Sequence, residues 1–556
     1  MIHDLAEADA PRAAEYDLVI VGSGPAGMTV ARELADSGLR IAVLESGRRT
    51  PTALGDRLRR VKSDGIRIKD YSRERVFGGA STTWAGLASP LDAIDFETRP
   101  FLAESGWPIA REELVPFWAA AARYRFASLE RFATGLSELR ESGEWRPTWR
   151  ALDEKVFLAA AEPQNFAREH GAIFERAGVD LFLDATVLEL RSARGAVERA
   201  RIRSSRGGES ELAARAFVLA TGGLENARLL LVSRDLCERG LGNEHDQVGR
   251  WLMNHPKNYH GVVALARPIV ELPYFFGALH EGFAGYAGLR FSEGVQRERE
   301  LLNSYVRFEP LFPWSDSRGV ESLVALAKRS KLVMRRVRGK GKAETVSLRD
   351  YSETGDDSDL QNERKTASGW LGLGWNVVAD APKVSRYAYH RVFGRARPKV
   401  RAVRLRNFME MEPDPENRVL LGSERDEYGQ PETVVRHRPT ARDKSSLIAL
   451  HAALREELAA NGFGKLDSSL ERAEPWPIDQ DASHHLGTTR MGRDPRRSVV
   501  DAELKLHAVP NVWLAGGSVF PTSGSANPTF TITALSIRLA EHLRAKLGAK
   551  RAEVRA

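Results

Sequence analysis

A short apolar run, a glycine-rich turn and an amphipathic stretch constrain the fold of this chain more than any other feature. Residues 16–21 are apolar and end at a glycine, which is typical of a buried parallel strand. Residues 25–37 place apolar side chains on one face of a helix, and residues 40–45 form a second apolar run. This succession predicts a βαβ unit. We therefore expect an α/β fold with a Rossmann-type unit over residues 16–45.

The turn inside this unit has the glycine spacing of dinucleotide-binding proteins. Its glycines permit a tight turn, close approach of a pyrophosphate and close packing of helix on strand, and the helix N-terminus adds partial positive charge. An acid at the end of the second strand can bind ribose hydroxyls. The residues predicted to bind a dinucleotide here are Gly22, Gly24, Pro25, Ala26, Gly27 and Glu45. A glycine-rich turn without a ligand is the alternative.

The composition is that of an ordinary globular protein. With 42% apolar and 28% charged residues in 556, we expect a large buried core and more than one structural unit. Cys237 is the only cysteine, which excludes an intrachain disulfide and a thiolate cluster, and no metal site is predicted. Residues 1–15 lack the pattern of a signal peptide, and no apolar run reaches the roughly 18 residues of a membrane span. We therefore expect a cytoplasmic protein.

Further stretches are predicted to face a planar cofactor. Residues 75–86 place small residues around one tryptophan, and small residues let a backbone lie along a flat ring. Strands are expected over 185–190 and 216–219, and the second of them leads through glycines into a helix. The predicted contacts from these stretches are Gly78, Gly79, Ser81, Thr82, Thr83, Trp84, Val187, Thr221 and Gly222.

Two C-terminal stretches, 483–492 and 523–529, carry the candidate chemistry. His484 can take a proton, and Asn527 offers both a donor and an acceptor to orient an alcohol oxygen. Asn527 can also cap the helix expected from Thr529. Gly517 and Thr529 complete the predicted cofactor contacts. For His485 a structural role is the stronger hypothesis.

The middle of the chain predicts a second lobe built on a mainly antiparallel sheet. Its six expected strands are 260–265, 284–291, 303–308, 405–412, 418–421 and 433–438. A helix is expected over 441–460. The predicted domains are a cofactor-binding domain from 1–95, 179–256 and 465–550, a helical segment over 96–178 that covers the cofactor, and a substrate-binding domain over 257–464.

Residues 328–342 and 383–406 are rich in lysine and arginine and contain no acid, in a chain of net charge +7. Such stretches can dock on an anionic membrane surface, or gather a phosphorylated or lipid-linked substrate. A solvated basic surface is the alternative hypothesis. Nucleic acid is not an expected partner, because no recognition motif accompanies the charge.

Several motifs together resemble those of the glucose–methanol–choline (GMC) oxidoreductases, flavoenzymes that oxidise alcohols. They occupy residues 22–27, 78–84, 412–419 and 484–492, and residues 223–226 and 524–529 are similar to the pyranose oxidase branch. The resemblance implies an FAD-binding domain of the GMC and p-hydroxybenzoate hydroxylase-like type. It also implies that His484 and Asn527 form the catalytic pair.

The activity implied by this resemblance is oxidation of a CH–OH group, a secondary alcohol of a sugar, glycoside or similar polyol. Hydride transfer to flavin N5 would proceed with His484 as general base. Thr83 stands where pyranose oxidases carry a histidine bonded to the flavin, so we expect non-covalent FAD. Oxygen, a quinone and a redox protein remain open as electron acceptors. The alternatives are a non-sugar or lipid-linked alcohol at a membrane, a flavin-fold binding module, and a nicotinamide-dependent reductase.

Overall fold

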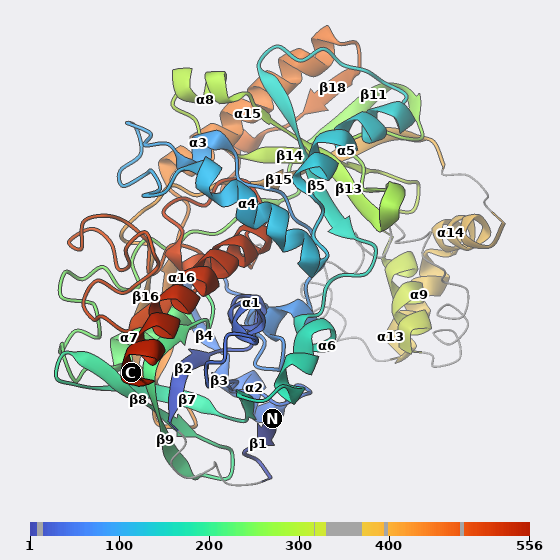
Figure 1. The fold of residues 1–556 in the computed structure, drawn as a ribbon. Helices are drawn as coiled ribbons and strands as arrows, with labels where there is room; N and C mark the ends of the chain where they lie inside the picture. Colours follow the sequence, from blue (N-terminus) through green and yellow to red (C-terminus); the bar gives the residue numbers. More distant parts are fainter. Residues whose placement is uncertain (8–14, 316, 330–369, 394–397, 479–482, 556) are drawn as a thin grey trace.

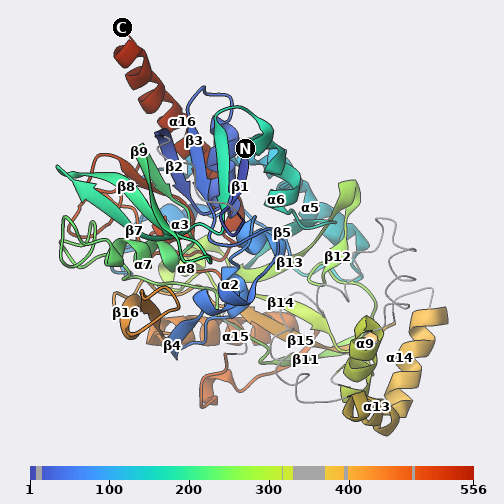
Figure 2. The same ribbon diagram turned by 90° about the horizontal axis from the view of Figure 1, so that it is seen from below.

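The computed structural model describes residues 1–556 except 8–14, 316, 330–369, 394–397, 479–482 and 556. Two large sheets lie at opposite ends of the molecule in Figure 1, and helix α16 (Thr529–Arg555) runs between them. Figure 2 shows the same arrangement from below, with the end of α16 projecting at one side.

The first sheet contains the predicted βαβ unit, formed by β2 (Tyr16–Val21), α1 (Pro25–Leu34) and β3 (Ile41–Leu44). Every residue of β2 and β3 is buried, as expected for central strands of a parallel sheet covered on both faces. Its other strands are β1 (Ile2–Asp4), β6 (Val179–Leu183), β7 (Thr186–Ala193), β8 (Ala196–Arg203), β9 (Glu209–Leu219) and β19 (Val512–Leu514).

Strand β9 joins two parts of this sheet. Its second half lies between β2 and β19 in the parallel part, whose order is β1-β6-β3-β2-β9-β19. Its first half pairs with β8 in an antiparallel meander that ends at β7. Helix α7 (Glu225–Val232) follows β9 through Thr221 and Gly222. The predicted Rossmann-type unit is therefore confirmed. The C-terminal end of β2 lies beside the C-terminal end of β9, where the chain turns into α7.

The second sheet is antiparallel, as predicted. Strands β5, β13, β14, β15, β11 and β18 lie side by side in that order, and short strands β10 and β12 pair with β15 and β13. Their bounds are β5 (Leu152–Ala160), β10 (Lys257–Asn258), β11 (Val262–Ile269), β12 (Gly277–Ala278), β13 (Phe283–Phe291), β14 (Tyr305–Pro310), β15 (Val400–Phe408) and β18 (Gly464–Asp467).

Two of the six strands predicted for this sheet belong to another sheet, so this part of the prediction was wrong. β16 (Arg418–Arg425) and β17 (Pro431–His437) form a separate three-stranded sheet with β4 (Val61–Gly65). β5 and β18 take their places, so the expected helical segment contributes a strand to the second sheet. The alternation of side chains identifies a strand but does not specify its partner. Here residues 433–437 of β17 pair with residues 61–65 of β4, which lie far away in the sequence.

Helices hold the beginning of α16 in place. α4 (Arg111–Ala121) and α5 (Leu129–Ser142) lie in the segment predicted to be helical. The ring of Phe530, at the start of α16, packs against Trp118 of α4, against Phe132 of α5 and against Phe126, which precedes α5. The remaining longer helix, α15 (Ala441–Ala460), was predicted and begins with a capping box between Thr440 and Asp443. The aromatic packing around Phe530 fixes the position of the neighbouring residues Asn527 and Thr529.

Three helices lie apart from both sheets at the edge of the molecule. They are α9 (Arg318–Arg329), α13 (Trp370–Ala379) and α14 (Ala381–Phe393), and both views show them as a peripheral group. Among the described residues, no helix is both long enough and apolar enough to cross a membrane.

Candidate active site

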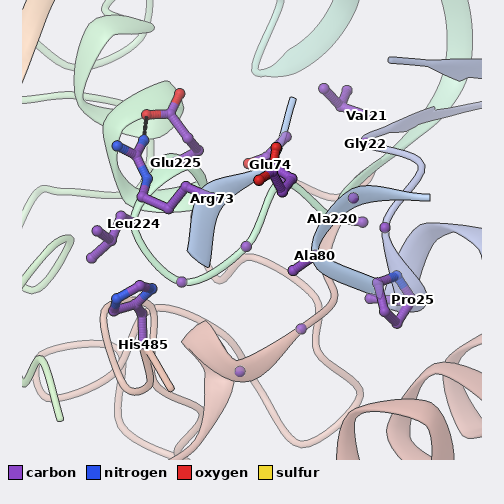
Figure 3. Close-up of a pocket in the computed structure, with 18 of the residues that line it drawn as sticks. Val21, Gly22, Pro25, Arg73, Glu74, Ala80, Ala220, Leu224, Glu225 and His485 are labelled. Atoms are coloured by element: carbon purple, nitrogen blue, oxygen red, sulfur yellow. Dashed lines mark hydrogen bonds and ion pairs between the residues drawn. The ribbon is translucent and has the colours of Figure 1, made fainter. Parts of the chain in front are cut away.

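A cleft runs along the ends of β2 and β3 and the start of α1 (Figure 3). Its volume, including the part that is open to solvent, is about 1400 Å³. The predicted cofactor residues in its wall are Gly22, Gly24, Pro25, Ala26, Glu45, Gly79, Val187, Thr221, Gly222, Gly517 and Thr529. Residues from the N-terminal, central and C-terminal parts of the chain therefore meet around one cleft.

The glycine turn of this cleft has the shape that a pyrophosphate needs. A Cβ at Gly24 or Gly222 would meet nothing within 4 Å, so both positions leave open space in the cleft wall. Gly22 has φ +102°, and a Cβ there would lie 2.5 Å from the Ala220 carbonyl oxygen. No side chain caps the N-terminus of α1, which leaves its first N–H groups available to an anion. The residues present therefore fit a dinucleotide.

Glu45 is held rigidly in the wall of the cleft. Its Oε2 accepts hydrogen bonds from the Ser23 amide at 3.1 Å and hydroxyl at 2.6 Å, and its Oε1 accepts one from the Gly47 amide at 2.8 Å. Burial raises the pKa of this carboxyl group. A carboxylate has about four acceptor positions, so three bonds leave one for a ligand hydroxyl.

The loop predicted to follow the flavin lies directly on the glycine turn. A Cβ at Gly79 would lie 2.9 Å from Gly24 Cα, and the Gly78 amide donates to Ser23 Oγ at 3.2 Å. Gly27, Gly78 and Thr82 do not line the cleft. Gly27 instead packs α1 on the sheet, since a Cβ there would lie 2.0 Å from the Gly22 carbonyl oxygen.

A second cavity of about 930 Å³ adjoins the cleft. The residues that line both the cleft and the second cavity are Pro25, Ser72, Ala80, Ser483, His484 and Thr529. The predicted Ser81, Thr83, Trp84 and Asn527 line this second cavity. Its far wall is a face of the second sheet and carries Lys257, Tyr286, Arg307, Arg406 and Phe408. A molecule in this cavity would lie between that sheet and the cofactor cleft.

His484 lies at the junction of the two hollows and is held by the segment around Asn254. Met253 and Leu486 exchange backbone hydrogen bonds of 3.0 Å in both directions. Asn254 Oδ1 accepts the His484 amide at 2.8 Å and the His255 amide at 2.9 Å. This short antiparallel bridge brings the rings of His255 and His484 together, with their Nδ1 atoms 2.8 Å apart.

The partners of His255 specify the tautomers of both rings. His255 Nε2 lies 2.8 Å from the Gly524 carbonyl oxygen, which can only accept, so this nitrogen carries the proton. Burial lowers the pKa of His255 to about 4, which keeps the ring neutral near pH 7. Its Nδ1 is therefore an acceptor, and His484 Nδ1 must donate to it. Neutral His484 then has its lone pair on Nε2.

Asn527 faces this lone pair. Its Nδ2 lies 3.5 Å from His484 Nε2, at the outer limit of a hydrogen bond. Asn527 immediately precedes Pro528 and the first residue of α16, whose position the aromatic packing fixes. The structure thus brings together the two residues that the sequence singled out for chemistry.

The sequence reasoning missed several residues of this region. His255 and Asn254 carried no motif of their own, and only their pairing with residues 484–486 reveals them. Arg73 and Glu225 form an ion pair of 2.5 Å in the cofactor cleft (Figure 3), and Glu225 also accepts from Arg75 at 3.1 Å. His485 lines the cofactor cleft but not the second cavity. Among the described residues, no cluster of three His, Cys, Asp or Glu side chains is placed to hold a metal ion.

Comparisons with known proteins agree with a flavin-dependent oxidoreductase. Residues 17–237 match the family described as FAD dependent oxidoreductase, and residues 413–536 match the family described as GMC oxidoreductase. These two regions contain the glycine turn and the His484–Asn527 pair. Both matches are to families of oxidoreductases.

The chain resembles, more particularly, the GMC oxidoreductases, both in its motifs and in the match over residues 413–536. It is 22% identical to 2-methyl-1,2-propanediol dehydrogenase from Mycolicibacterium austroafricanum, over 95% of each chain. It is 34% identical to 6'''-hydroxyparomomycin C oxidase from Streptomyces lividus over 150 residues, and spans only 27% of that protein's length. Pyridoxine 4-oxidase from Mesorbium loti has the same fold, with TM-score 0.52 and 17% identity over 95% of this chain and 99% of its own.

Proposed function

We propose that this enzyme oxidises a CH–OH group, a secondary alcohol of a sugar, glycoside or similar polyol, to a carbonyl. The observation that carries the proposal is the fixed His484 tautomer, with its Nε2 facing Asn527 in a cavity that adjoins the cofactor cleft. When bound, FAD supplies the hydride-accepting chemistry. Similarity to an oxidase named for an aminoglycoside supports a sugar-like substrate.

In the proposed reaction, His484 Nε2 takes the proton of the substrate hydroxyl. The 3.5 Å between His484 Nε2 and Asn527 Nδ2 leaves a place where one alcohol oxygen can contact both nitrogens. The Asn527 amide would donate to that oxygen as negative charge develops on it. His484 becomes a cation in this step, and its Nδ1–H continues to donate to neutral His255. No side chain needs to turn, because both rings are oriented beforehand.

Anaerobic mixing of the FAD-loaded enzyme with a panel of alcohols tests the proposal. We expect at least one pyranoside or cyclic polyol to bleach the yellow colour of the flavin, and the panel should include the vicinal diol 2-methyl-1,2-propanediol. If the diol alone bleached the flavin, the proposed substrate class would be a non-sugar alcohol and not a sugar. If no alcohol bleaches the flavin, the chain is better described as a binding module.

We further propose that FAD is held without a covalent bond. In the described part of the chain, the cleft wall contains neither cysteine nor tyrosine, and Thr83 lies on the adjoining cavity. Acid precipitation should therefore leave the yellow colour in the supernatant. A yellow pellet would contradict this, and repeating the precipitation with His484→Ala and with His485→Ala would then show whether either histidine of the cleft wall is the linked residue.

A second proposed role is docking on an anionic membrane through α13 and α14. Trp375, Val378 and Tyr389 are 71%, 67% and 68% exposed, which is unusual for large apolar side chains. Lys383, Arg386 and Arg391 are exposed on α14 beside them. Aromatic and apolar side chains with basic neighbours are the combination that binds a lipid interface. Most of the basic stretch 328–342, and Arg395 and Arg397, lie outside the described residues.

Sedimentation with vesicles of phosphatidylserine and phosphatidylcholine measures this docking. We expect binding at low salt that fades as salt screens the attraction. The triple substitution Lys383→Gln, Arg386→Gln and Arg391→Gln should abolish it. The matched control changes three exposed arginines elsewhere, Arg493, Arg496 and Arg497, to glutamine and should still bind. Equal sedimentation of both triple variants would contradict a docking surface on α14.

A further inference from the structure

We infer that Asp95 is a positioning residue of the proposed reaction and acts through Gly524 and His255. Its buried carboxylate stabilises the positive charge that the His255–His484 pair acquires when His484 takes the proton of the alcohol. The inference rests on the proposed role of His484 as base. It adds a charged group that no motif of the sequence singles out.

The Asp95 carboxyl group and the ring of His255 both contact Gly524. His255 Nε2 lies 2.8 Å from the Gly524 carbonyl oxygen. Gly524 has φ +57°, and a Cβ there would lie 2.5 Å from Asp95 Oδ2, so the space beside the carboxyl group admits only glycine. Thr522 Oγ1 donates to the Asp95 carbonyl oxygen at 2.7 Å and accepts from Trp107 Nε1 at 2.9 Å. These bonds hold the turn that carries Gly524 against Asp95.

The carboxyl group of Asp95 is fully buried in the short helix α3 (Ala93–Phe96). Its Oδ2 accepts the Asp92 amide at 2.9 Å, and its Oδ1 accepts Asn303 Nδ2 at 3.0 Å. Neither donor carries a charge. Burial, together with the carboxylates of Asp92 and Glu410, raises the pKa of Asp95 to about 7. Asp95 therefore changes its charge close to neutral pH.

The other charged groups around Asp95 form a compact buried cluster. Lys155 Nζ and Arg290 Nη1 lie 2.6 and 3.1 Å from Asp92 Oδ2. Arg99 Nη2 lies 2.7 Å from Glu410 Oε1. Burial opposes ionisation of both acids, but these ion pairs lower the pKa of Asp92 to about 2 and also lower the pKa of Glu410. Two carboxylates among three cations leave one positive charge, which ionised Asp95 cancels.

A surplus positive charge in this cluster opposes formation of a cation on the histidine pair. Little water screens charges in a buried site, so they act strongly on one another. Burial lowers the pKa of His255 to about 4, and the Glu410 carboxylate opposes that shift, so the charges of the cluster do act on the pair. His484 Nδ1 lies 2.8 Å from His255 Nδ1. Ionised Asp95 removes the surplus charge and therefore favours proton transfer to His484.

Carbethoxylation of His484 measures this effect without turnover, because diethyl pyrocarbonate reacts with the neutral imidazole. His484 lines both the cleft and the second cavity, so the reagent can reach it. The rate at His484 is followed by mass spectrometry across neutral pH in the FAD-loaded wild type and variants. We expect Asp95→Asn to lower the pKa of His484 by about one unit. Asp153→Asn, which changes an exposed acid of β5, is the matched control and should leave that pKa unchanged.

Flavin reduction by the alcohol gives a second readout. One pKa unit corresponds to about a tenfold change in a protonation equilibrium. Asp95→Asn should therefore reduce its flavin about 10-fold more slowly than the wild type at alkaline pH, where wild-type Asp95 is ionised. The difference should shrink as pH falls below about 7, because the wild-type side chain is then neutral as well. A ratio of rates that is the same at every pH would contradict a role for the charge.

Urea unfolding tests the ionisation of Asp95 itself. Its pKa is about 7 in the folded protein and about 3.9 in the unfolded chain, so it contributes stability that is present below the unfolded value and lost as pH rises through about 7. Asp95→Asn should lack this part of the decline in the free energy of unfolding. The same decline in both proteins would show that Asp95 does not titrate as argued.

If Asp95→Asn does not fold, Lys155→Met provides a test with the opposite sign. It removes one cation from the cluster and should raise the pKa of His484. A general disturbance of the site does not predict opposite shifts for loss of an acid and loss of a base.

An unchanged pKa of His484 in folded Asp95→Asn, or a lower one in Lys155→Met, would overturn the inference. Bleaching of the wild-type flavin by an alcohol in that case would leave the proposed oxidation intact. Conversely, a pKa of His484 that depends on Asp95, with no bleaching by any alcohol, would support the coupling of the two residues and refute the proposed oxidation.

Discussion

Replacement of His484 by alanine is expected to lower the rate of flavin reduction by the alcohol by about 10²–10⁴-fold, the usual contribution of a positioned general base. FAD should remain bound, because the glycine turn and Glu45 that fit the dinucleotide lie elsewhere in the cleft. Stopped-flow absorbance under anaerobic conditions measures the rate, and the ratio of flavin to protein absorbance measures occupancy.

Rescue by a small base distinguishes loss of the proton acceptor from a general disturbance of the site. Imidazole added to His484→Ala should restore part of the rate, in proportion to the fraction of neutral imidazole as pH is raised. A His484→Ala enzyme that reduces its flavin at the wild-type rate would remove His484 from the mechanism.

Replacement of His255 by leucine should slow flavin reduction by about 10–10²-fold, as loss of a partner that orients a functional histidine typically does. Leucine neither accepts from His484 Nδ1 nor donates to the Gly524 carbonyl, so His484 is no longer held with its lone pair on Nε2. His255→Gln offers one acceptor and one donor and should recover part of the loss. Equal rates for both variants and the wild type would show that His255 does not position the base.

The pH dependence gives this role a separate signature. Protonated His255 would donate from Nδ1, and His484 would then have to carry its proton on Nε2 and could not act as base. Burial lowers the pKa of His255 to about 4, so neutral His255 should continue to orient His484 in the wild type until pH falls through about 4. The depressed pKa also means that His255 contributes to folding stability above its unfolded value of about 6.5, and that this contribution is lost as pH falls towards 4. His255→Leu should lack that part of the acid-induced decline in the free energy of unfolding.

Local rules explain why the sequence alone predicted the βαβ unit and its glycine turn. A strand, a glycine turn and a helix within thirty residues are determined by neighbours in the chain, and Gly22 and Gly24 line the cleft as expected. The pairing of β17 with β4 could not be predicted in this way, since nothing in either segment identifies a partner hundreds of residues away.

The same limit applies to the site residues that were missed. His255 acquires its proposed role only when residues 253 and 486 pair, and Arg307 lies opposite Arg406 only in the register of β14 and β15. Read along the chain, Arg406 was the last residue of a basic stretch and Arg307 an ordinary strand residue. Motifs singled out the proposed reacting groups, His484 and Asn527, whereas the residues that orient them depend on tertiary pairing.

The central claim is that a carbinol loses its C–H hydrogen at the His484–Asn527 site. The most direct measurement is a single anaerobic turnover with a sugar deuterated at the carbinol carbon that is oxidised, followed by mass spectrometry of the product. We predict a ketone that has lost the deuterium, formed by the wild-type enzyme and at most in traces by His484→Ala. A product that retains the deuterium, or no product while the flavin bleaches, would contradict the claim.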